Sequence, residues 1–321
     1  MKIAYIKPTF PEEKRVGLLP QHLPLCSKED ERRFETGYGE DLNISDSAYG
    51  SAGGYTREEL FAWADVIYCI KVPQPQDYKY FRENQTIAGW VHPLGFSGRH
   101  FANNCAKVKN LSMFDVTNTI SIRYHQGKSE RLDIPRDITQ KNSVIAGYAS
   151  MNQAIMLRGG ITKTDRVGIF GSGNVVYGAL KYLAGMGIDP ILRRRSNVHL
   201  LQEELSTYDI FINGVEIADG DAPIATKEMI DGMKSGAWII DLAADAERAI
   251  EGTRQTSIKN PLYTDEHNHT FYVVSNSPSL LYRQSSEAVS EGYATHFWSK
   301  PMAYWYSNDC LATSTPELAY A

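Results

Sequence analysis

Short apolar runs recur along the chain, and stretches with helical spacing of apolar residues separate them. The runs are rich in Val, Ile, Phe and Tyr and end at Gly, Pro, Asn or Asp, which is typical of buried strands. The predicted strands are residues 1–6, 66–70, 86–91, 113–116, 167–170, 190–192, 209–212, 237–241 and 271–274. Strands that alternate with helices form right-handed crossovers, so the pattern predicts an α/β fold with mainly parallel sheets.

The length of 321 residues exceeds the size that one hydrophobic core usually serves, so we expect two domains. A long apolar helix that starts at Asn142 or Ser143 is predicted to connect them. A last helix over residues 279–299 could carry the chain back to the first domain. We therefore expect a discontinuous substrate domain, a cofactor domain and an inter-domain cleft. The expected boundaries are 1–138 plus 278–321 for the substrate domain and 139–277 for the cofactor domain.

A glycine turn after the strand at 167–170 is the main functional motif. It is followed by an amphipathic helix, so backbone N–H groups and the positive end of a helix dipole meet at one point. A dinucleotide pyrophosphate binds at such a turn, which predicts a Rossmann-like domain. The third glycine of the fingerprint is absent, because Val176 stands in its place. The residues predicted to bind the pyrophosphate are Gly171, Ser172, Gly173, Asn174 and Val175.

The strand at 190–192 ends about 20 residues after the glycines, where the ribose-reading residue is expected. No Asp or Glu stands there; the strand runs into Arg193, Arg194, Arg195 and Ser196. Guanidinium groups suit a 2′-phosphate, so we predict NADP(H) as the cofactor. A solvated basic strand end is the alternative. Further cofactor-binding residues are predicted at Ser143, Asn213, Gly214, Val215 and Asn276.

Two strands of the first domain deliver Lys71 and His92 at their carboxyl ends. Ligands of open α/β sheets bind at this edge, so we expect both side chains in the active site. Arg15, in a charged loop after the first strand, could hold a carboxylate with its guanidinium fork. Asp245 follows a strand of the second domain at the corresponding edge. The alternatives are a surface arginine at Arg15 and a structural histidine at His92.

Composition excludes several classes of function. The net charge is −5, with 42% hydrophobic and 22% charged residues, so there is no basic footprint for nucleic acid or an anionic membrane. We expect neither a signal peptide nor a membrane span, because no apolar run approaches about 18 residues. The four cysteines are scattered, which favours reduced thiols and a cytoplasmic protein. The run at 265–269 is interpreted as a polar turn, and no metal site is predicted.

The order of the motifs resembles one family of dehydrogenases. The segments 13–16 and 19–20, then Lys71, His92, the glycine turn and residues 241–245 follow the order seen in alanine dehydrogenases and the related transhydrogenase and saccharopine dehydrogenase proteins. Further segments are similar to the N(5)-(carboxyethyl)ornithine synthases of this family, at 89–93, 212–216, 243–246, 250–253 and 276–283. The resemblance covers about residues 1 to 300.

This resemblance implies an NADPH-dependent oxidoreductase of the opine-synthase type, which acts on CH–NH bonds. It would condense pyruvate, a 2-oxo acid, with the side-chain amine of ornithine or lysine to give an N-(1-carboxyethyl) amino acid. Arg15 would anchor the oxo-acid carboxylate, Lys71 would polarise the ketone or hold the same acid, and His92 would be the acid–base group. Asp245 would orient His92 or the ribose and stabilise the iminium. We expect small-molecule substrates and a homo-oligomer.

Two departures from the family pattern concern the choice of reaction. The glycine pair that follows the catalytic Asp in alanine dehydrogenases is replaced by Ala246-Glu247-Arg248, which favours an opine-type synthase. The segment from Pro301 onward has no counterpart and could shape a different substrate pocket. An amino-acid dehydrogenase that uses ammonia is the main alternative. A nucleotide-sensing protein without catalysis is another, but the joint presence of the candidate residues argues against it.

Overall fold

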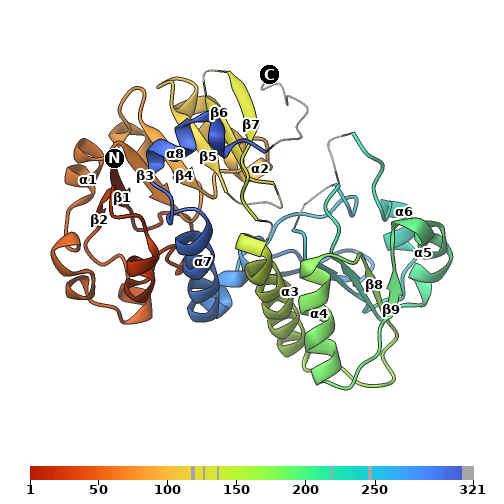
Figure 1. Cartoon of the computed structure of the whole chain (residues 1–321). Coiled ribbons are helices and arrows are strands. Elements are labelled where there is room, and N and C mark those ends of the chain that lie inside the picture. Colours follow the sequence, from red (N-terminus) through yellow and green to blue (C-terminus); the bar gives the residue numbers. More distant parts are fainter. Residues whose placement is uncertain (117–119, 126, 136, 218–219, 245–247, 313–321) are drawn as a thin grey trace. The chain divides into compact units, whose positions relative to one another are not determined.

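The computed structural model describes residues 1–116, 120–125, 127–135, 137–217, 220–244 and 248–312. The chain divides into two compact units, which Figure 1 colours along the sequence. Unit 1 consists of Met1–Gln140 and Tyr282–Ala321, and unit 2 consists of Lys141–Leu281. Each unit is built on one β-sheet.

Unit 1 contains a seven-stranded sheet with the strand order β2-β1-β3-β4-β5-β6-β7. The strands from β2 to β5 pair in parallel, and β6 and β7 add an antiparallel hairpin at one edge. The strands are β1 Lys2–Tyr5, β2 Glu31–Phe34, β3 Val66–Cys69, β4 Thr86–Gly89, β5 Ser112–Asp115, β6 Ile122–His125 and β7 Lys128–Arg131. The parallel pairing brings the carboxyl ends of β1, β3, β4 and β5 to one edge.

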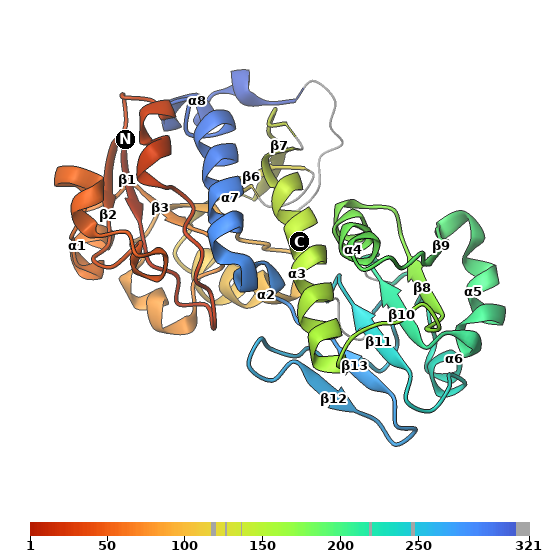
Figure 2. The ribbon, with the colours of Figure 1, turned by 90° about the horizontal axis from the view of Figure 1, so that it is seen from below.

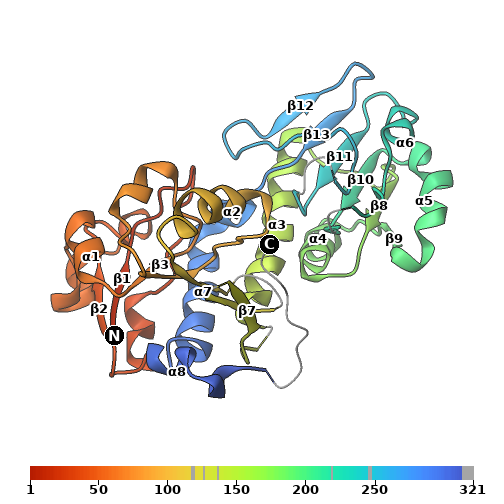
Figure 3. The ribbon, with the colours of Figure 1, turned by 90° about the horizontal axis from the view of Figure 1, so that it is seen from above.

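Apolar side chains cover both faces of this sheet. Tyr68 and Phe114 belong to one core, which α7 and α8 close, and Ile67 and Ile87 belong to the other, which α1 and α2 close. Figure 3 shows α1 and α2 on one side of the sheet and α7 and α8 on the other. Strands buried on both faces are apolar at nearly every position, which explains the continuous runs in the sequence. The helices are α1 Arg57–Trp63, α2 Phe96–Phe101, α7 Tyr282–His296 and α8 Met302–Tyr306.

The segment after α7 is part of the core of unit 1. Trp298 and Trp305 are at most 2% exposed. The indole N–H of Trp305 donates to Phe297 O at 3.0 Å, and Arg123 of β6 donates to Trp305 O at 2.8 Å. The expectation that residues after Pro301 shape a substrate pocket is therefore wrong for Trp305, because its side chain fills the core.

Unit 2 contains a six-stranded sheet with the order β12-β13-β11-β10-β8-β9, in which only the edge strand β12 is antiparallel. Helices α3 and α4 cover one face and α5 and α6 the other (Figure 2). The two mainly parallel sheets confirm the predicted α/β fold. The elements are α3 Asp137–Arg158, β8 Val167–Phe170, α4 Asn174–Gly185, β9 Ile191–Arg193, α5 Val198–Glu204, β10 Ile210–Asn213, α6 Lys227–Asp231, β11 Trp238–Asp241, β12 Leu262–Thr264 and β13 Thr270–Tyr272.

Strand β2 and helix α3 are among the elements that differ from the sequence-based prediction. Strand β2 was not predicted, because its sequence Glu-Arg-Arg-Phe is charged, which an edge strand tolerates. Helix α3 begins at Asp137 and not at Asn142 or Ser143. Its second residue, Ile138, is buried in the core of unit 1, so tertiary packing extends the helix beyond the start that the local pattern indicates.

The run at 265–269 forms the polar turn between β12 and β13. The Asp265 carboxylate accepts the backbone N–H of His267 at 3.0 Å and of His269 at 2.7 Å, and it contacts Nδ1 of His269 at 2.9 Å. Within the part of the chain that the structure describes, no three His, Cys, Asp or Glu side chains gather as a metal site. No described helix is long and apolar enough to span a bilayer.

Candidate active site

The carboxyl edge of the sheet in unit 1 brings the ends of three parallel strands together. Cys69 pairs with Gly89, and Gly89 pairs with Asp115. Gly89 has a φ of 131°, and a Cβ at this position would lie 1.8 Å from Cys69 O, so only glycine fits. Lys71 and His92 follow β3 and β4 directly. The topology therefore places both side chains at the edge that ends in Asp115.

His92 has a backbone conformation that few non-glycine residues adopt, with a φ of 47°. Its N–H and that of Val91 both donate to Oδ1 of Asp115 at 3.2 Å. The carbonyl of His92 accepts the N–H of Gly95 at 3.0 Å. A strained residue persists only where its surroundings hold it, and strain of this kind clusters at functional sites. The carboxylate of Asp115 therefore supports this turn through two backbone N–H groups.

Arg15 forms a buried ion pair with Glu13, and neither side chain is exposed to solvent. Nε of Arg15 donates to Oε1 at 2.8 Å and Nη2 donates to Oε2 at 2.6 Å. The guanidinium also lies over the ring of Trp90, with 4.9 Å from Cζ to the ring centre. Arg15 is therefore not a surface arginine, because a carboxylate and an aromatic ring fix its orientation.

The segment that follows Arg15 has no regular secondary structure, and α7 holds it. Oγ of Ser286 accepts the N–H of Val16 at 3.0 Å, and Oγ of Ser290 accepts the N–H of Leu19 at 2.7 Å. Both serines are fully buried. Because these N–H groups have no strand partner, the two hydroxyls take the place of a neighbouring strand. Helix α7 thereby fixes the position of Arg15.

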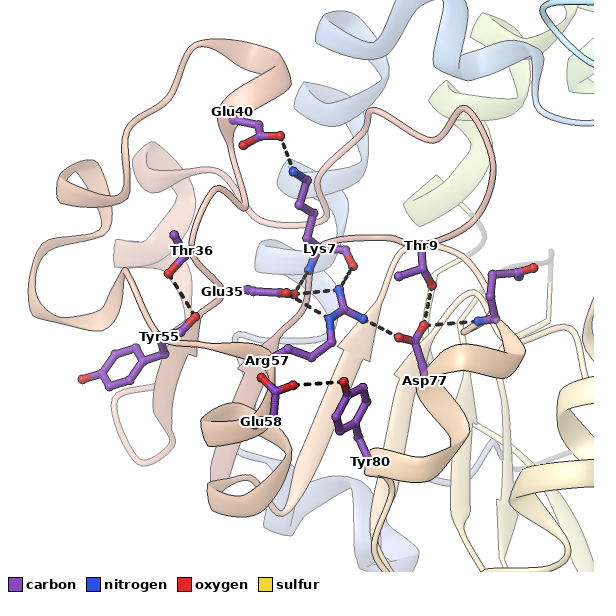
Figure 4. A network of polar contacts seen from close by, with 11 residues as sticks. Lys7, Thr9, Glu35, Thr36, Glu40, Tyr55, Arg57, Glu58, Asp77 and Tyr80 are labelled. Carbon is purple, nitrogen blue, oxygen red and sulfur yellow. Dashed lines mark hydrogen bonds and ion pairs between the residues drawn. The ribbon is translucent and has the colours of Figure 1, made fainter.

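A second ion-pair network holds the loop between β1 and Arg15 (Figure 4). Arg57, at the start of α1, donates to both carboxylate oxygens of Glu35 at 2.9 Å and to Asp77 at 2.7 Å. It also donates to the carbonyl of Lys7 at 2.6 Å. The hydroxyl of Thr9 donates to the same Asp77. The loop is therefore tied to α1, β2 and the segment after β3.

Burial and neighbouring charges shift the pKa values in this site. Burial and the charge of Arg15 lower the pKa of Lys71 to about 8, and Glu13 opposes this shift. Burial lowers the pKa of His92; Asp115 opposes this shift and Lys71 adds to it. Burial acts to raise the pKa of Glu13, but Arg15 outweighs it and the pKa is lowered. Lys71 therefore releases its proton more readily than an ordinary lysine, and burial favours the neutral form of His92.

In unit 2, the chain forms a glycine turn between β8 and α4. Gly171 has a φ of 121°, which only glycine adopts readily. Gly173 is the N-cap of α4, and a Cβ added there would meet no atom within 4 Å. Ser172 and Gly173 are exposed, so an anion can reach the first N–H groups of the helix. The turn therefore fits a dinucleotide pyrophosphate.

Val176 stands where the dinucleotide fingerprint has its third glycine, and two other glycines make room for it. A Cβ at Gly214 would lie 2.3 Å from Cγ2 of Val176, and a Cβ at Gly171 would lie 2.9 Å from the same atom. The close helix contact is made two residues later, because a Cβ at Gly178 would lie 1.9 Å from Val144 O of α3. The departure from the fingerprint is therefore compensated locally.

We expect Gly214→Ala to lower the free energy of unfolding by about 1–3 kcal/mol, because the added methyl group overlaps Val176. Adding Val176→Ala to this variant removes the overlap. Urea unfolding of both single variants and of the double variant measures the coupling free energy between the two substitutions. We expect the double variant to be more stable than the sum of the single effects by at least about 1 kcal/mol. Additive effects of the two substitutions would show that Val176 does not determine the need for glycine at 214.

The three arginines after β9 have different surroundings. The end of β9 lies beside the glycine turn, since the N–H of Gly171 donates to Arg193 O at 2.8 Å. The guanidinium of Arg193 is bound by both carboxylate oxygens of Glu204, at 2.9 and 2.6 Å. Arg194 and Arg195 are exposed. Arg193 therefore has a structural carboxylate partner, whereas the exposed Arg195 donates to Glu216 O at 3.2 Å.

The other cofactor-binding candidates lie at strand ends or in α3. Nδ2 of Asn213, at the end of β10, donates to Oδ1 of Asp241 at 2.9 Å and to Val215 O at 3.0 Å. These bonds fix the loop after β10 against the end of β11. Asn276 is buried after β13, and Ser143 is half-buried in α3. The structure places these two residues in different elements.

Three residues at the site of unit 1 had no role in the sequence-based prediction: Glu13, Trp90 and Asp115. Asp115 lies near the carboxyl end of the strand predicted at 113–116, at the same sheet edge as Lys71 and His92, so the sequence could have indicated it. Glu13 precedes Arg15 by two positions, the spacing that places side chains on one side of an extended segment. The candidate Asp245 lies outside the residues that the structure describes.

Comparison with protein-family models gives two matches. The "Alanine dehydrogenase/PNT, N-terminal domain" matches residues 6–119, and the "Alanine dehydrogenase/PNT, C-terminal domain" matches residues 180–303. The first range contains Arg15, Lys71 and His92, and the second begins shortly after the glycine turn.

Two proteins named N(5)-(carboxyethyl)ornithine synthase are similar to nearly the whole chain. The one from Clostridium botulinum (strain Hall) is 40% identical over 95% of this chain and 96% of its own. The one from Lactococcus lactis subsp. lactis (strain IL1403) is 36% identical over 96% and 99%. A solved L-alanine dehydrogenase structure, 20% identical, has a TM-score of 0.71 and covers 92% of this chain and 88% of its own, which supports the fold alone.

Proposed function

The chain belongs to the alanine dehydrogenase/PNT family, and we propose that it condenses pyruvate reductively with the side-chain amine of ornithine or lysine, using NADPH. The product would be an N-(1-carboxyethyl) amino acid. The protein is an oxidoreductase acting on CH–NH bonds. The observation that carries the proposal is the similarity over nearly the full length to two proteins named for this type of product.

The cations of unit 1 support binding of an oxo acid. Nε and Nη2 of Arg15 donate to the carboxylate of Glu13. These two bonds fix the plane of the guanidinium and therefore the direction in which Nη1 points. We propose that this side binds the pyruvate carboxylate. Protonated Lys71 would donate to the keto oxygen and polarise the carbonyl. The guanidinium of Arg15 and the ammonium of Lys71 would both attract the anionic substrate.

Neutral His92 is suited to the proton transfers of imine formation. It would accept one proton from the incoming ammonium group, so that the free amine attacks the keto carbon. A second proton moves from nitrogen to oxygen in the carbinolamine. His92 then returns its proton to the hydroxyl, which leaves as water, and the iminium nitrogen keeps the third proton. Hydride addition gives a secondary amine, which takes one further proton from solvent.

The glycine turn of unit 2 would hold the cofactor. The N–H groups at the start of α4 would bind the pyrophosphate, and Arg194 and Arg195 would bind the 2′-phosphate. Bound NADPH supplies the hydride and no other chemistry. The roles implied for Ser143, Asn276 and Asp245 stay predictions, as do a homo-oligomer and a cytoplasmic location.

We expect the double substitution Arg194→Gln and Arg195→Gln to raise the KM for NADPH by roughly 10- to 100-fold, since one or two charge-assisted contacts are lost. The KM for NADH should change little. Arg193→Gln is the matched control, because its guanidinium binds Glu204. The assignment fails if the Arg193 variant loses NADPH affinity as strongly, or if the unmodified protein uses both cofactors equally well.

Initial rates of NADPH oxidation with pyruvate test the proposed reaction. Parallel reactions contain ornithine, lysine or ammonium, and mass spectrometry identifies the products. We expect oxidation with ornithine or lysine and little with ammonium alone. Oxidation with ammonium and formation of alanine would favour the alternative, an amino-acid dehydrogenase. Absence of oxidation with any amine would contradict both reactions.

A further inference from the structure

Asp115 lies at the end of β5, where its carboxylate meets the strained turn that carries His92. We propose that Asp115 is a positioning residue, which holds His92 in its left-handed conformation and supplies the negative charge that the imidazole requires. This inference deepens the proposed function, since it assigns the support of the acid–base group.

The geometry assigns one oxygen of Asp115 to the backbone of the turn. Oδ1 accepts the N–H groups of both Val91 and His92 at 3.2 Å. Asp115 pairs with Gly89 in the sheet, so its Cα is fixed relative to β4. The residue is only 6% exposed, and water therefore competes little for its oxygen atoms. Loss of this acceptor would remove the shared partner of one buried and one partly buried N–H group beside a strained residue.

Two charged side chains, at the end of β5 and after β3, act on the pKa of His92. Asp115 from β5 acts to raise the pKa of His92, and Lys71 from the end of β3 acts to lower it. Helix α2 packs against the turn, since a Cβ at Gly98 would lie 2.1 Å from His92 O. The charged residue next to Gly98, Arg99, donates to Leu94 O at 3.0 Å. Burial and Lys71 both lower the pKa of His92, and the negative charge of Asp115 limits this decrease.

Two substitutions separate the two roles. Asp115→Asn keeps an oxygen acceptor at the same place but removes the charge, so kcat at the optimum should stay within about threefold, since an uncharged acceptor still holds the turn. The acidic limb of the kcat/KM profile should move to lower pH, because the pKa of His92 falls further. Asp115→Leu removes the acceptor as well, and kcat should fall on the order of 10²-fold, as expected for a misplaced catalytic group.

Asp30→Asn is the control, because Asp30 is equally buried, at 6%, but binds the N-terminus and the N–H of Met302. It should leave the pH profile unchanged. NMR titration of the His92 ring, compared with His92→Gln for assignment, measures the shift without any substrate. A His92 pKa that is the same in Asp115→Asn and in the unmodified protein would overturn the inference, even if the proposed reaction failed. Full kcat in a folded Asp115→Leu variant would overturn the positioning role.

Discussion

Replacement of His92 by Gln should lower kcat by about 10²- to 10⁴-fold, the usual contribution of a general acid–base group, and should leave the KM for pyruvate nearly unchanged. Glutamine keeps the size and hydrogen bonding of the side chain but does not titrate. The carbinolamine hydroxyl then leaves without its proton donor. Rates at saturating amine and NADPH measure this effect.

The pH profile distinguishes His92 from Lys71. In the unmodified protein, kcat/KM should fall as the pH drops through the lowered pKa of His92, because the imidazole must start neutral. It should also fall as the pH rises above about 8, because Lys71 then loses the proton that polarises the ketone. His92→Gln removes the acidic limb and Lys71→Met removes the alkaline one. If His92→Gln kept kcat and both limbs, the acid–base role would pass to Lys71, whose pKa of about 8 permits it.

Removing one partner of the buried Glu13–Arg15 pair should lower the free energy of unfolding by about 3–5 kcal/mol, because the remaining charge has no solvent to stabilise it. Glu13→Leu should cost more than Arg15→Leu. The first leaves Arg15 and Lys71 as two buried cations, whereas the second leaves Glu13 with Lys71 as a partner. Chemical denaturation of both variants and of the double variant measures these differences.

The sign of the pH dependence follows from the lowered pKa of Glu13. The folded state binds the Glu13 proton less tightly than the unfolded state, so the pair stabilises the protein above the unfolded pKa of a glutamate. This contribution is lost as the pH falls through the folded pKa. Arg15→Lys keeps the charge but loses the two-point contact, and its larger effect should be on the KM for pyruvate. Equal stability of both single variants and the unmodified protein would contradict the account of the pair.

Much of the fold follows from local pattern. The strands at 66–70, 86–91, 167–170 and 209–212 are apolar at nearly every position, because helices cover both faces of the sheets, and such runs have few alternative structures. Strand β2 was not predicted, because a strand at the edge of a sheet does not require apolar residues. The start of α3 at Asp137 depends on packing of Ile138 into unit 1, which no local window contains.

The sequence predicts only those site residues that directly follow a predicted strand. Lys71 and His92 follow their strands directly, so topology alone places them at one edge. Asp115 supports His92 through the backbone, a contact that depends on the positive φ of His92 and is invisible in the sequence. The engagement of Arg193 by Glu204 likewise depends on the position of α5. The predicted inter-domain cleft stays a prediction.

Transfer of deuterium from NADPH labelled at C4 of the dihydronicotinamide tests the central claim most directly. The reaction contains pyruvate and ornithine or lysine, and mass spectrometry locates the label in the product. The account predicts one deuterium on the carbon that was the keto carbon of pyruvate, now bonded to the side-chain nitrogen. Label in alanine formed from ammonium, or no label transfer with either diamino acid, would contradict it.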